Sequence, residues 1–414
     1  MTAIVAGNGL EFYDFLIYAI FAVYIGEAFF PATSAEGNLL ESLAVFGIGF
    51  VTRPIGAVVL GRLGDRIGRK NAMLVSFWLM GVGIIGLMLT PTYARIGIAA
   101  PILVVLFRLI QGFAIGGDIG PTTTYLTETA PPHRRGLYGA MQAMSQGVAS
   151  VLAALVGVLL SLVLTADALA AWGWRLAMLP GALIIPFAIA VRRNLPETLH
   201  RAADPIRQPI EPRHRKLVFL AILALGAGTI GLYTTLYMPT YALTVLHMPA
   251  ASSFAIGLVG AMVALVTAPV SGHLSDRFGR RTLMIAGSAI GTLTIIPGYW
   301  LIVHQPSAWT LYPVIALVTF ASSLATTPLL TTITESFPAR IRCSALAITY
   351  AVAITIFGGS TQFVLAWLIH YSGDPMAIAY YRAAAVAIGL VAVLMIAESA
   401  PARARPRAAA LAPA

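Results

Sequence analysis

The sequence predicts an all-α membrane protein in which twelve transmembrane helices form two pseudo-symmetric six-helix bundles. Three observations lead to this prediction: an excess of apolar residues, a regular alternation of apolar runs with short polar segments, and two motifs that each occur twice. Hydrophobic residues make up 58% of the 414 residues, charged residues only 10%, and the mean hydropathy is +0.85. A water-soluble domain needs far more polar surface to cover its core. Most of the surface is therefore expected to face the lipid bilayer.

Twelve apolar runs, separated by polar breaks, are each long enough for the roughly 20 residues that a helix needs to cross a bilayer. The runs lie near 8–30, 39–60, 72–91, 98–127, 137–164, 173–191, 217–245, 253–272, 282–303, 310–333, 343–369 and 377–397. The longest polar stretch, 192–216, holds four prolines and seven cations. We interpret it as a linker between an N-terminal bundle, 1–191, and a C-terminal bundle, 217–398, which is followed by a tail at 399–414.

Most of the 26 Lys and Arg residues occupy every second polar segment, and the segments between them hold almost none. The basic segments are 61–70, 134–135, 192–216, 277–281, 340–342 and 403–407. Short basic loops mark the cytoplasmic side of a membrane, so both termini and the linker are expected in the cytoplasm and the protein in the inner membrane. The net charge of +10 comes from these loops and not from a soluble basic face, which argues against a nucleic-acid partner.

Residues that support catalysis or metal binding form no recognisable pattern. The single cysteine, Cys343, excludes an intramolecular disulfide and a cysteine-based metal site. No two histidines are paired at helical spacing, and no nucleotide loop, nucleophile triad or zinc motif occurs. The sequence therefore predicts neither an enzyme nor a bound metal or cofactor. The first apolar run lacks a basic leader and is interrupted by acids, so a cleavable signal peptide is not expected.

Two motifs recur in the same order in both halves. Residues 61–70 read GRLGDRIGRK after the second apolar run, and residues 272–281 read GHLSDRFGRR after the eighth, an offset of 211 residues. Residues 127–131, TETAP, after the fourth run match 334–338, TESFP, after the tenth. Both pairs lie on the same predicted side of the membrane. Such repeats predict two halves related by an axis along the membrane normal.

The duplicated GxLxDRxGRR-type loop resembles the signature of the major facilitator superfamily. Segments 7–15 (GNGLEFYDF), 49–56 (GFVTRPIG), 108–113 (RLIQGF) and 172–175 (WGWR) resemble the metabolite–proton symporter family. Within it, 237–241 (YMPTY) and 356–360 (IFGGS) are most similar to the citrate and other di- and tricarboxylate symporters. The resemblance covers nearly the whole chain. It implies the major facilitator fold, a monomer, and proton-coupled import of a small organic acid by alternating access.

Ionisable residues inside the membrane are costly and mark functional sites. The first run contains Glu11 and Asp14 at i and i+3, and the fourth contains Arg108, Gln111 and Asp118 at i, i+3 and i+10. These spacings place each set on one helix face, which we expect to turn toward a cavity between the halves. The core of the second half contains no acid, so proton chemistry is predicted for the first half.

Asp14 and Arg108 are the leading candidates for proton coupling. Burial disfavours an ionised carboxylate and a neighbouring cation favours it, so an arginine that moves can switch proton affinity. Resemblance to the first- and fourth-helix pair of sugar–proton symporters supports this role; the alternative is a permanent ion pair that tethers two helices. Glu11 is either a second proton site or a brace for the first helix. Asp118 is a further candidate. It ends the segment Gly-Gly-Asp, 116–118, where the family usually has Gly-Gly-Glu.

Arg108 and Arg53 are the predicted contacts of an anionic substrate, because guanidinium groups bind carboxylates through two parallel hydrogen bonds. Arg53 could instead pair with the first-helix acids or the backbone. Further polar side chains on the expected cavity faces, either ligand contacts or helix-packing groups, are Asn8, Gln111, Gln142, Gln146, Tyr233, Tyr237 and Tyr241. Arg382, near the outer end of the last run, is expected to snorkel to the interface, the alternative being a second-half carboxylate contact.

The duplicated loops are predicted to form a cytoplasmic gate. We expect Asp65 to cap a helix N-terminus in its own half and to pair with arginines of the facing half. Its removal is expected to matter more than that of Asp276, because Arg62 adds a cation where the second copy has His273. The other predicted gate residues are Arg66, Arg69, Glu128, Arg135, Arg280, Glu335 and Arg342. The alternative is a solvated charge run that serves only as a topology signal.

Alternatives to carboxylate import keep the same fold. They are proton-driven export of an organic acid or drug, and symport of another metabolite such as a betaine or a shikimate-like acid. A membrane sensor would need a soluble signalling domain, and the loops leave no room for one.

Overall fold

The computed structural model describes residues 2–30, 45, 47–194, 212–246, 248, 250–338 and 341–400. Within these ranges, ten helices are long and apolar enough to cross a membrane. The described residues of the two predicted spans that are not among the ten are also largely helical. The span at 8–30 is covered by α1 and α2, which meet at Phe21, and the span at 39–60 runs into α4.

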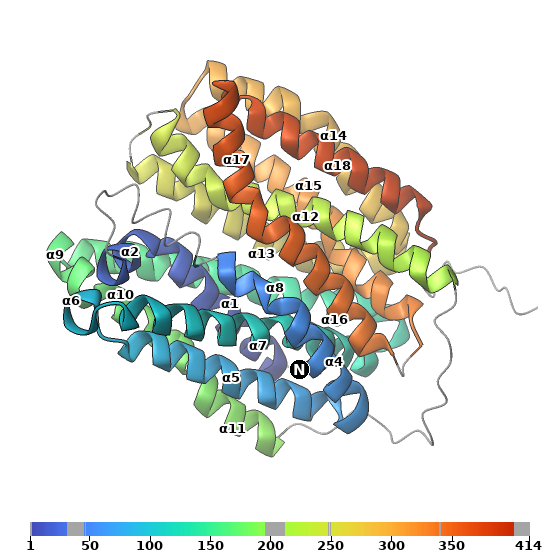
Figure 1. Ribbon diagram of the computed structural model, residues 1–414. Helices are drawn as coiled ribbons and strands as arrows, with labels where there is room; N and C mark the ends of the chain where they lie inside the picture. Colours follow the sequence, from blue (N-terminus) through green and yellow to red (C-terminus); the bar gives the residue numbers. More distant parts are fainter. Residues whose placement is uncertain are drawn as a thin grey trace, which may run out of the picture.

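Figure 1 shows two groups of helices packed side by side, the N-terminal one from blue to green and the C-terminal one from yellow-green to red. The first group consists of α1 (Thr2–Ile20), α2 (Ala22–Phe29), α4 (Arg53–Ile67), α5 (Arg69–Leu89), α6 (Tyr93–Ile96), α7 (Ala99–Thr129), the turn Pro132–Arg134, α8 (Arg135–Val163), α9 (Ala166–Ala168), a π turn at Leu169–Gly173, α10 (Trp174–Ala182) and α11 (Ile184–Asn194). The second consists of α12 (Pro212–Thr244), α13 (Ala250–Phe278), α14 (Arg280–His304), α15 (Ala308–Ser336), α16 (Arg342–Ala353), a π turn at Ile354–Gly358, α17 (Gly359–Ser372) and α18 (Ala377–Met395).

The repeated loop has the same backbone conformation in both halves. Gly68 separates α4 from α5 at φ 110°, and Gly279 separates α13 from α14 at φ 99°. A side chain rarely adopts this positive φ, and glycine adopts it without a steric penalty. The sequence repeat is therefore also a structural repeat, and it places Asp65 and Asp276 at equivalent helix ends.

Helices α4 and α7 approach so closely that their backbones touch. A Cβ on Gly112 of α7 would lie 1.8 Å from the carbonyl oxygen of Gly49, just before α4, and a Cβ on Gly56 of α4 would lie 1.9 Å from that of Phe113. Only glycine fits at such contacts, which are common where helices pack in membranes. These two helices therefore form one closely packed unit.

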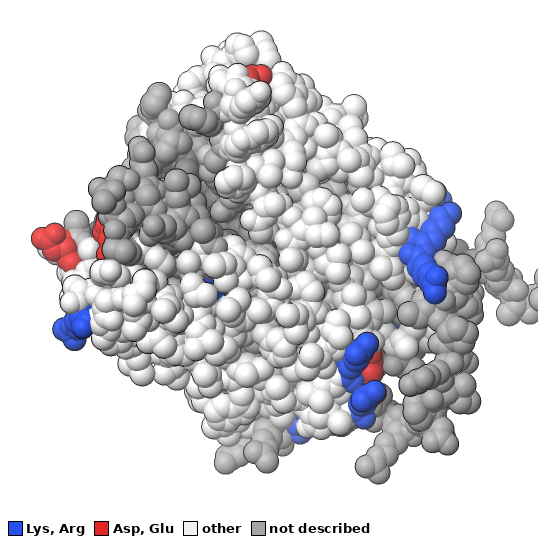
Figure 2. All heavy atoms as spheres, in the orientation of Figure 1, with Lys and Arg blue, Asp and Glu red and all other residues white. Residues whose placement is uncertain are grey.

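The two halves meet mainly along α8 with α13 and along α16 with α4 and α7. Each half also has its own apolar core, around Phe77 and Trp174 in the first and around Tyr299 and Met284 in the second. Figure 2 shows that the visible Lys and Arg gather mostly at one end of the molecule, where α12 begins and α18 ends, and the visible Asp and Glu mostly at the opposite end.

Candidate functional site

Asp14 and Arg108 are connected through a third side chain. Asp14 of α1 is fully buried, and its Oδ2 accepts a 2.9 Å hydrogen bond from Nε2 of Gln111. Oε1 of Gln111 in turn accepts from Nη1 of Arg108, also at 2.9 Å. Oδ1 of Asp14 has no hydrogen-bond partner among the described residues. Gln111 therefore transmits a change at the carboxyl group to the guanidinium group, and one carboxyl oxygen remains available for a proton.

A second acidic cluster lies one helical turn away along α1. Glu11 and Asp118 are close enough to interact electrostatically. Two carboxylates that share a buried site repel each other when both are ionised, so the site favours holding one proton. Asp118 also accepts from Thr122 at 2.8 Å and from Asn8 at 3.5 Å, and Glu11 accepts from Ser76 at 3.1 Å. This cluster can hold one proton inside the membrane.

Arg53 lies where the two halves meet. Its side chain is buried, and its guanidinium carbon lies 3.9 Å from the ring centroid of Phe50 and 4.8 Å from that of Phe15. It is hydrogen-bonded to Tyr233 of α12, in the other half. Its Nε has no hydrogen-bond partner among the described residues. Aromatic faces stabilise a cation but do not neutralise it, so the charge of Arg53 can still attract an anion.

Arg108 contacts the same aromatic ring from another direction. Its guanidinium carbon is 5.8 Å from the Phe15 centroid and 4.0 Å from the Tyr18 centroid. Two buried guanidinium groups therefore lie close to Phe15, and one of them is connected to Asp14. This arrangement places groups that bind a carboxylate beside a group that can bind a proton.

The other predicted substrate contacts fall into two sets. Asn8 joins the Asp118 cluster, and Gln142 accepts from a threonine of α7, with its Nε2 unpartnered among the described residues. Tyr237 and Tyr241 instead belong to the apolar core of the second half. The hydroxyl of Tyr241 donates to the carbonyl of Pro375 at 3.0 Å. The structure therefore does not bring these two tyrosines to the arginines.

The aromatic side chains Phe15 and Phe50 are parts of the site that charge and polarity patterns do not reveal. Both lie beside residues that the motifs do reveal: Phe15 follows Asp14 directly, and Phe50 lies three residues before Arg53. An aromatic residue adjacent to an intramembrane charge is the signal that could have identified them.

The expectation that Arg382 snorkels to the interface is wrong. Its side chain is fully buried inside the second half. Nη1 donates to the hydroxyls of Tyr299 at 3.1 Å and Thr235 at 3.4 Å, and Nη2 donates to that of Ser322 at 3.4 Å. The side chain points inward because three helices offer hydroxyl acceptors there, a packing arrangement that sequence position alone does not show.

The gate aspartates cap helices of the opposite half, which corrects the expectation of a cap within one half. Oδ2 of Asp65 accepts from the backbone N–H of Ser344, in the first turn of α16, at 3.0 Å. The carboxylate of Asp276 accepts from the backbone N–H groups of Gly136 and Leu137, at the start of α8, at 2.8 and 3.0 Å. Through these two contacts Asp276 joins the second half to α8.

Four of the remaining gate residues take part in ion pairs around these caps: Arg280, Glu335, Arg342 and Glu128. Arg280 pairs with Asp276 at 2.7 Å and with Glu335 at 3.2 Å, both within the second half. Arg342 pairs with Glu128 across the halves at 3.4 Å. Arg66 is exposed, Arg135 is half-buried, and the side chain of Arg69 lies outside the described residues. The backbone N–H groups of 280 and 281 donate to Glu398, which follows α18.

The single cysteine lies beneath this gate. Cys343 of α16 is fully buried, and a Cβ on Gly64 of α4 would lie 3.0 Å from its Sγ. A Cβ on Gly120 of α7 would lie 3.3 Å from the same atom. The thiol is therefore enclosed by the opposite half as long as this end of the molecule is closed.

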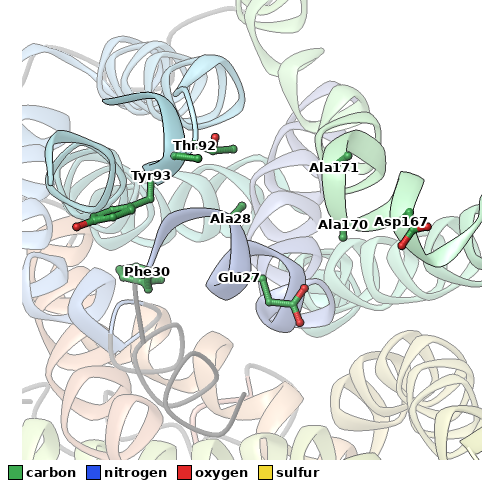
Figure 3. A pocket seen from close by; sticks show the side chains of 9 residues that line it. Glu27, Ala28, Phe30, Thr92, Tyr93, Asp167, Ala170 and Ala171 are labelled. Atoms are coloured by element: carbon green, nitrogen blue, oxygen red, sulfur yellow. The ribbon is translucent and has the colours of Figure 1, made fainter. Parts of the chain in front are cut away.

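A pocket of about 520 Å³ opens at the other end (Figure 3). It is lined by residues of α2, α6 and the α9 region, including Glu27, Tyr93 and Asp167. It contains none of the predicted site residues. Among the described residues, no group of three or more His, Cys, Asp or Glu side chains is placed to hold a metal ion.

These features define a multi-pass membrane transporter built from two halves. Residues 5–360 match the Major Facilitator Superfamily, and the chain belongs to this family; it is a transporter and not an enzyme. A citrate-proton symporter of Klebsiella pneumoniae is 36% identical over 396 residues, covering 94% of this chain and 89% of the relative. A shikimate transporter of Escherichia coli (strain K12) is 32% identical over 411 residues, covering 95% and 93%.

The structural comparison confirms the predicted fold. The chain superposes on the proton:xylose symporter XylE bound to 6-bromo-6-deoxy-D-glucose with a TM-score of 0.79, covering 96% of this chain and 95% of the other. At 17% sequence identity this likeness concerns the fold alone.

Proposed function

We propose that the protein is a proton-coupled symporter that imports a small organic acid, a di- or tricarboxylate such as citrate, by alternating access. The observation that carries the proposal is the pair of buried guanidinium groups of Arg53 and Arg108, both close to the ring of Phe15. Each guanidinium group presents a pair of N–H donors that can bind one carboxylate, so two such groups suit a substrate with more than one carboxylate. Sequence similarity to a citrate-proton symporter along nearly the whole chain supports the same substrate class.

Proton coupling is proposed for Asp14, with Glu11 and Asp118 as a second site. When a proton neutralises Asp14, the Gln111 bridge no longer connects Arg108 to an anion. Binding of a substrate carboxylate to the guanidinium group of Arg108 then becomes more favourable. Proton and substrate therefore favour each other's binding, which is the coupling a symporter needs.

The gate is proposed to lie on the cytoplasmic side, with both termini there, in the inner membrane and in a monomer. The support is the concentration of Lys and Arg at that end of the molecule (Figure 2) together with the positive-inside rule. In this arrangement the structure has its cytoplasmic side closed by the caps of Asp65 and Asp276.

Counterflow of labelled citrate into proteoliposomes tests the substrate class. Unlabelled citrate, α-ketoglutarate, shikimate and betaine should be compared as competitors. We expect citrate and α-ketoglutarate to compete and the monocarboxylates shikimate and betaine not to, and we expect Arg53→Gln to abolish counterflow. Arg95→Gln, which removes an exposed arginine far from the site, is the matched control. Inhibition by betaine alone would contradict the carboxylate assignment.

A monocarboxylate such as shikimate is the second candidate substrate, favoured by the similarity to a shikimate transporter. The competitor panel separates it from citrate.

Direction is tested by imposing a pH gradient: concentrative uptake toward the alkaline side supports import, and accumulation only toward the acidic side supports proton-driven export.

A further inference from the structure

Arg382 occupies a polar site inside the second half that the proposed transport mechanism does not use. The residue lies in the second turn of α18, and its side chain is fully buried. Among the described residues its guanidinium group donates only to neutral hydroxyls, those of Tyr299 on α14, Thr235 on α12 and Ser322 on α15. Four helices therefore converge on one positive charge.

No carboxylate balances this charge. The second half contains four acids in all: Asp276, Glu335, Asp374 and Glu398. Three belong to the gate, and Asp374 accepts a 2.8 Å hydrogen bond from the backbone N–H of Met376 at the start of α18. A buried charge without a counter-charge costs several kcal/mol. The site is therefore complete only when an anion is present.

The donors for such an anion are already in place. Nε of Arg382 is buried and has no hydrogen-bond partner among the described residues, and the same is true of the hydroxyl of Thr319. Thr319 is a neighbour of Thr235, since both approach the position of a Cβ on Gly260, at 3.8 and 3.1 Å. Two unpartnered polar groups thus lie in one cluster, and each can donate to an anion.

Gly231 lies against the guanidinium group. A Cβ on Gly231 would lie 3.2 Å from Oγ of Ser322 and 3.6 Å from Nη2 of Arg382. A larger residue at position 231 would therefore press on these donors. The single positive charge favours a small anion of charge −1 over a di- or tricarboxylate.

Helix α12 separates this cluster from the substrate site proposed above. Gly231 and Thr235, spaced i and i+4, lie on the face toward Arg382, and Tyr233 lies on the opposite face, where it is hydrogen-bonded to Arg53. The two buried cationic sites are therefore on opposite sides of one helix.

We propose that Arg382, with the hydroxyls of Tyr299, Thr235, Ser322 and Thr319, forms a binding site for a small monovalent anion inside the second half. The anion is a halide or the carboxylate of a small acid, since both accept hydrogen bonds from guanidinium and hydroxyl donors. It neutralises Arg382 and joins α12, α14, α15 and α18 through one shared ligand. This role does not depend on which substrate the protein transports.

Thermal unfolding of the purified protein tests the proposal. The melting temperature is measured in sulfate buffer, whose anion is divalent, with added chloride, and separately with added acetate, at constant ionic strength. A ligand that binds only the folded state raises the melting temperature. We expect one of the two anions to give a saturable rise. The anion that does so identifies the occupant, and binding of that anion in radiolabelled form gives the stoichiometry.

Two variants connect the effect to the site. Arg382→Leu removes the buried charge and should fold, because replacing an uncompensated charge by an apolar residue relieves its cost; it should lose the anion response. Gly231→Ala keeps the charge and presses on the donors, and should weaken the response. Arg53→Gln, which changes the arginine on the other side of α12, should keep it. A response unchanged in Arg382→Leu, or no response to either anion in the wild type, would overturn the proposal.

Discussion

Asp276→Asn should open the end of the molecule that the caps close. The carboxylate of Asp276 accepts two backbone N–H groups at the start of α8 and pairs with Arg280. The asparagine side chain keeps one acceptor oxygen but loses the charge that the helix N-terminus and the arginine stabilise. The loss is about 1–3 kcal/mol for a largely buried interaction of this kind. Such a loss shifts the population about 5- to 150-fold toward the open state.

Cys343 is a built-in reporter of this opening. Its thiol is buried against Gly64 and Gly120 of the opposite half, and it is the only cysteine in the chain. A maleimide can reach it only when the halves separate at this end, so the labelling rate follows the open population. We therefore expect the purified Asp276→Asn protein to be labelled about 5- to 150-fold faster than the wild type.

The choice of Asp276 keeps the reporter undisturbed. Asp65 contacts Ser344, the neighbour of Cys343, whereas Asp276 contacts α8. Asp374→Asn is the matched control, because Asp374 also caps a helix, but within its own half and at the other end of α18. It should leave the labelling rate unchanged. An unchanged rate in Asp276→Asn would refute the gate and leave the duplicated loops as topology signals.

Three further predictions follow from the site and the helix packing. Asp14→Asn should abolish uptake against a gradient but preserve citrate counterflow, since exchange requires no net proton release; full concentrative uptake would exclude Asp14 from coupling. Arg108→Lys should weaken substrate binding measured by calorimetry about 10- to 100-fold, because a point charge loses one charge-assisted hydrogen bond; unchanged affinity would contradict the anion site. Gly112→Ala should yield no monodisperse protein by size-exclusion chromatography, because its Cβ would overlap the carbonyl of Gly49, whereas Gly47→Ala, with open space around it, should be tolerated.

The fold could be predicted because its determinants are periodic in sequence. Apolar run length defines the helices, and the repeat at 61–70 and 272–281 defines the two halves. Helical spacing also placed Glu11 and Asp14 on one face of α1, where the structure has both. Information of this kind is contained within single helices, so it can be read without knowing how they pack.

Contacts between helices were harder to predict. Spacing does not reveal which neighbour a face meets, and so the cap of Asp65 was assigned to the wrong half. Position along a helix suggested that Arg382 reaches the interface, but hydroxyls on three other helices hold it inside. Tyr241 was placed near the substrate for its polarity, and a carbonyl in the α17–α18 loop satisfies its hydroxyl instead.

The backbone contact between α4 and α7 fixes the spacing of the two helices that carry Arg53 and Arg108. Arg53 begins α4 and Arg108 lies on α7, and glycines that admit no side chain join the two helices. Rocking of the halves can bring Tyr233 toward Arg53 or take it away, but it leaves the spacing of the α4 and α7 backbones that carry the two arginines unchanged. If the two arginines bind the substrate as proposed, we expect the first half to favour the same separation of negative groups on both sides of the membrane.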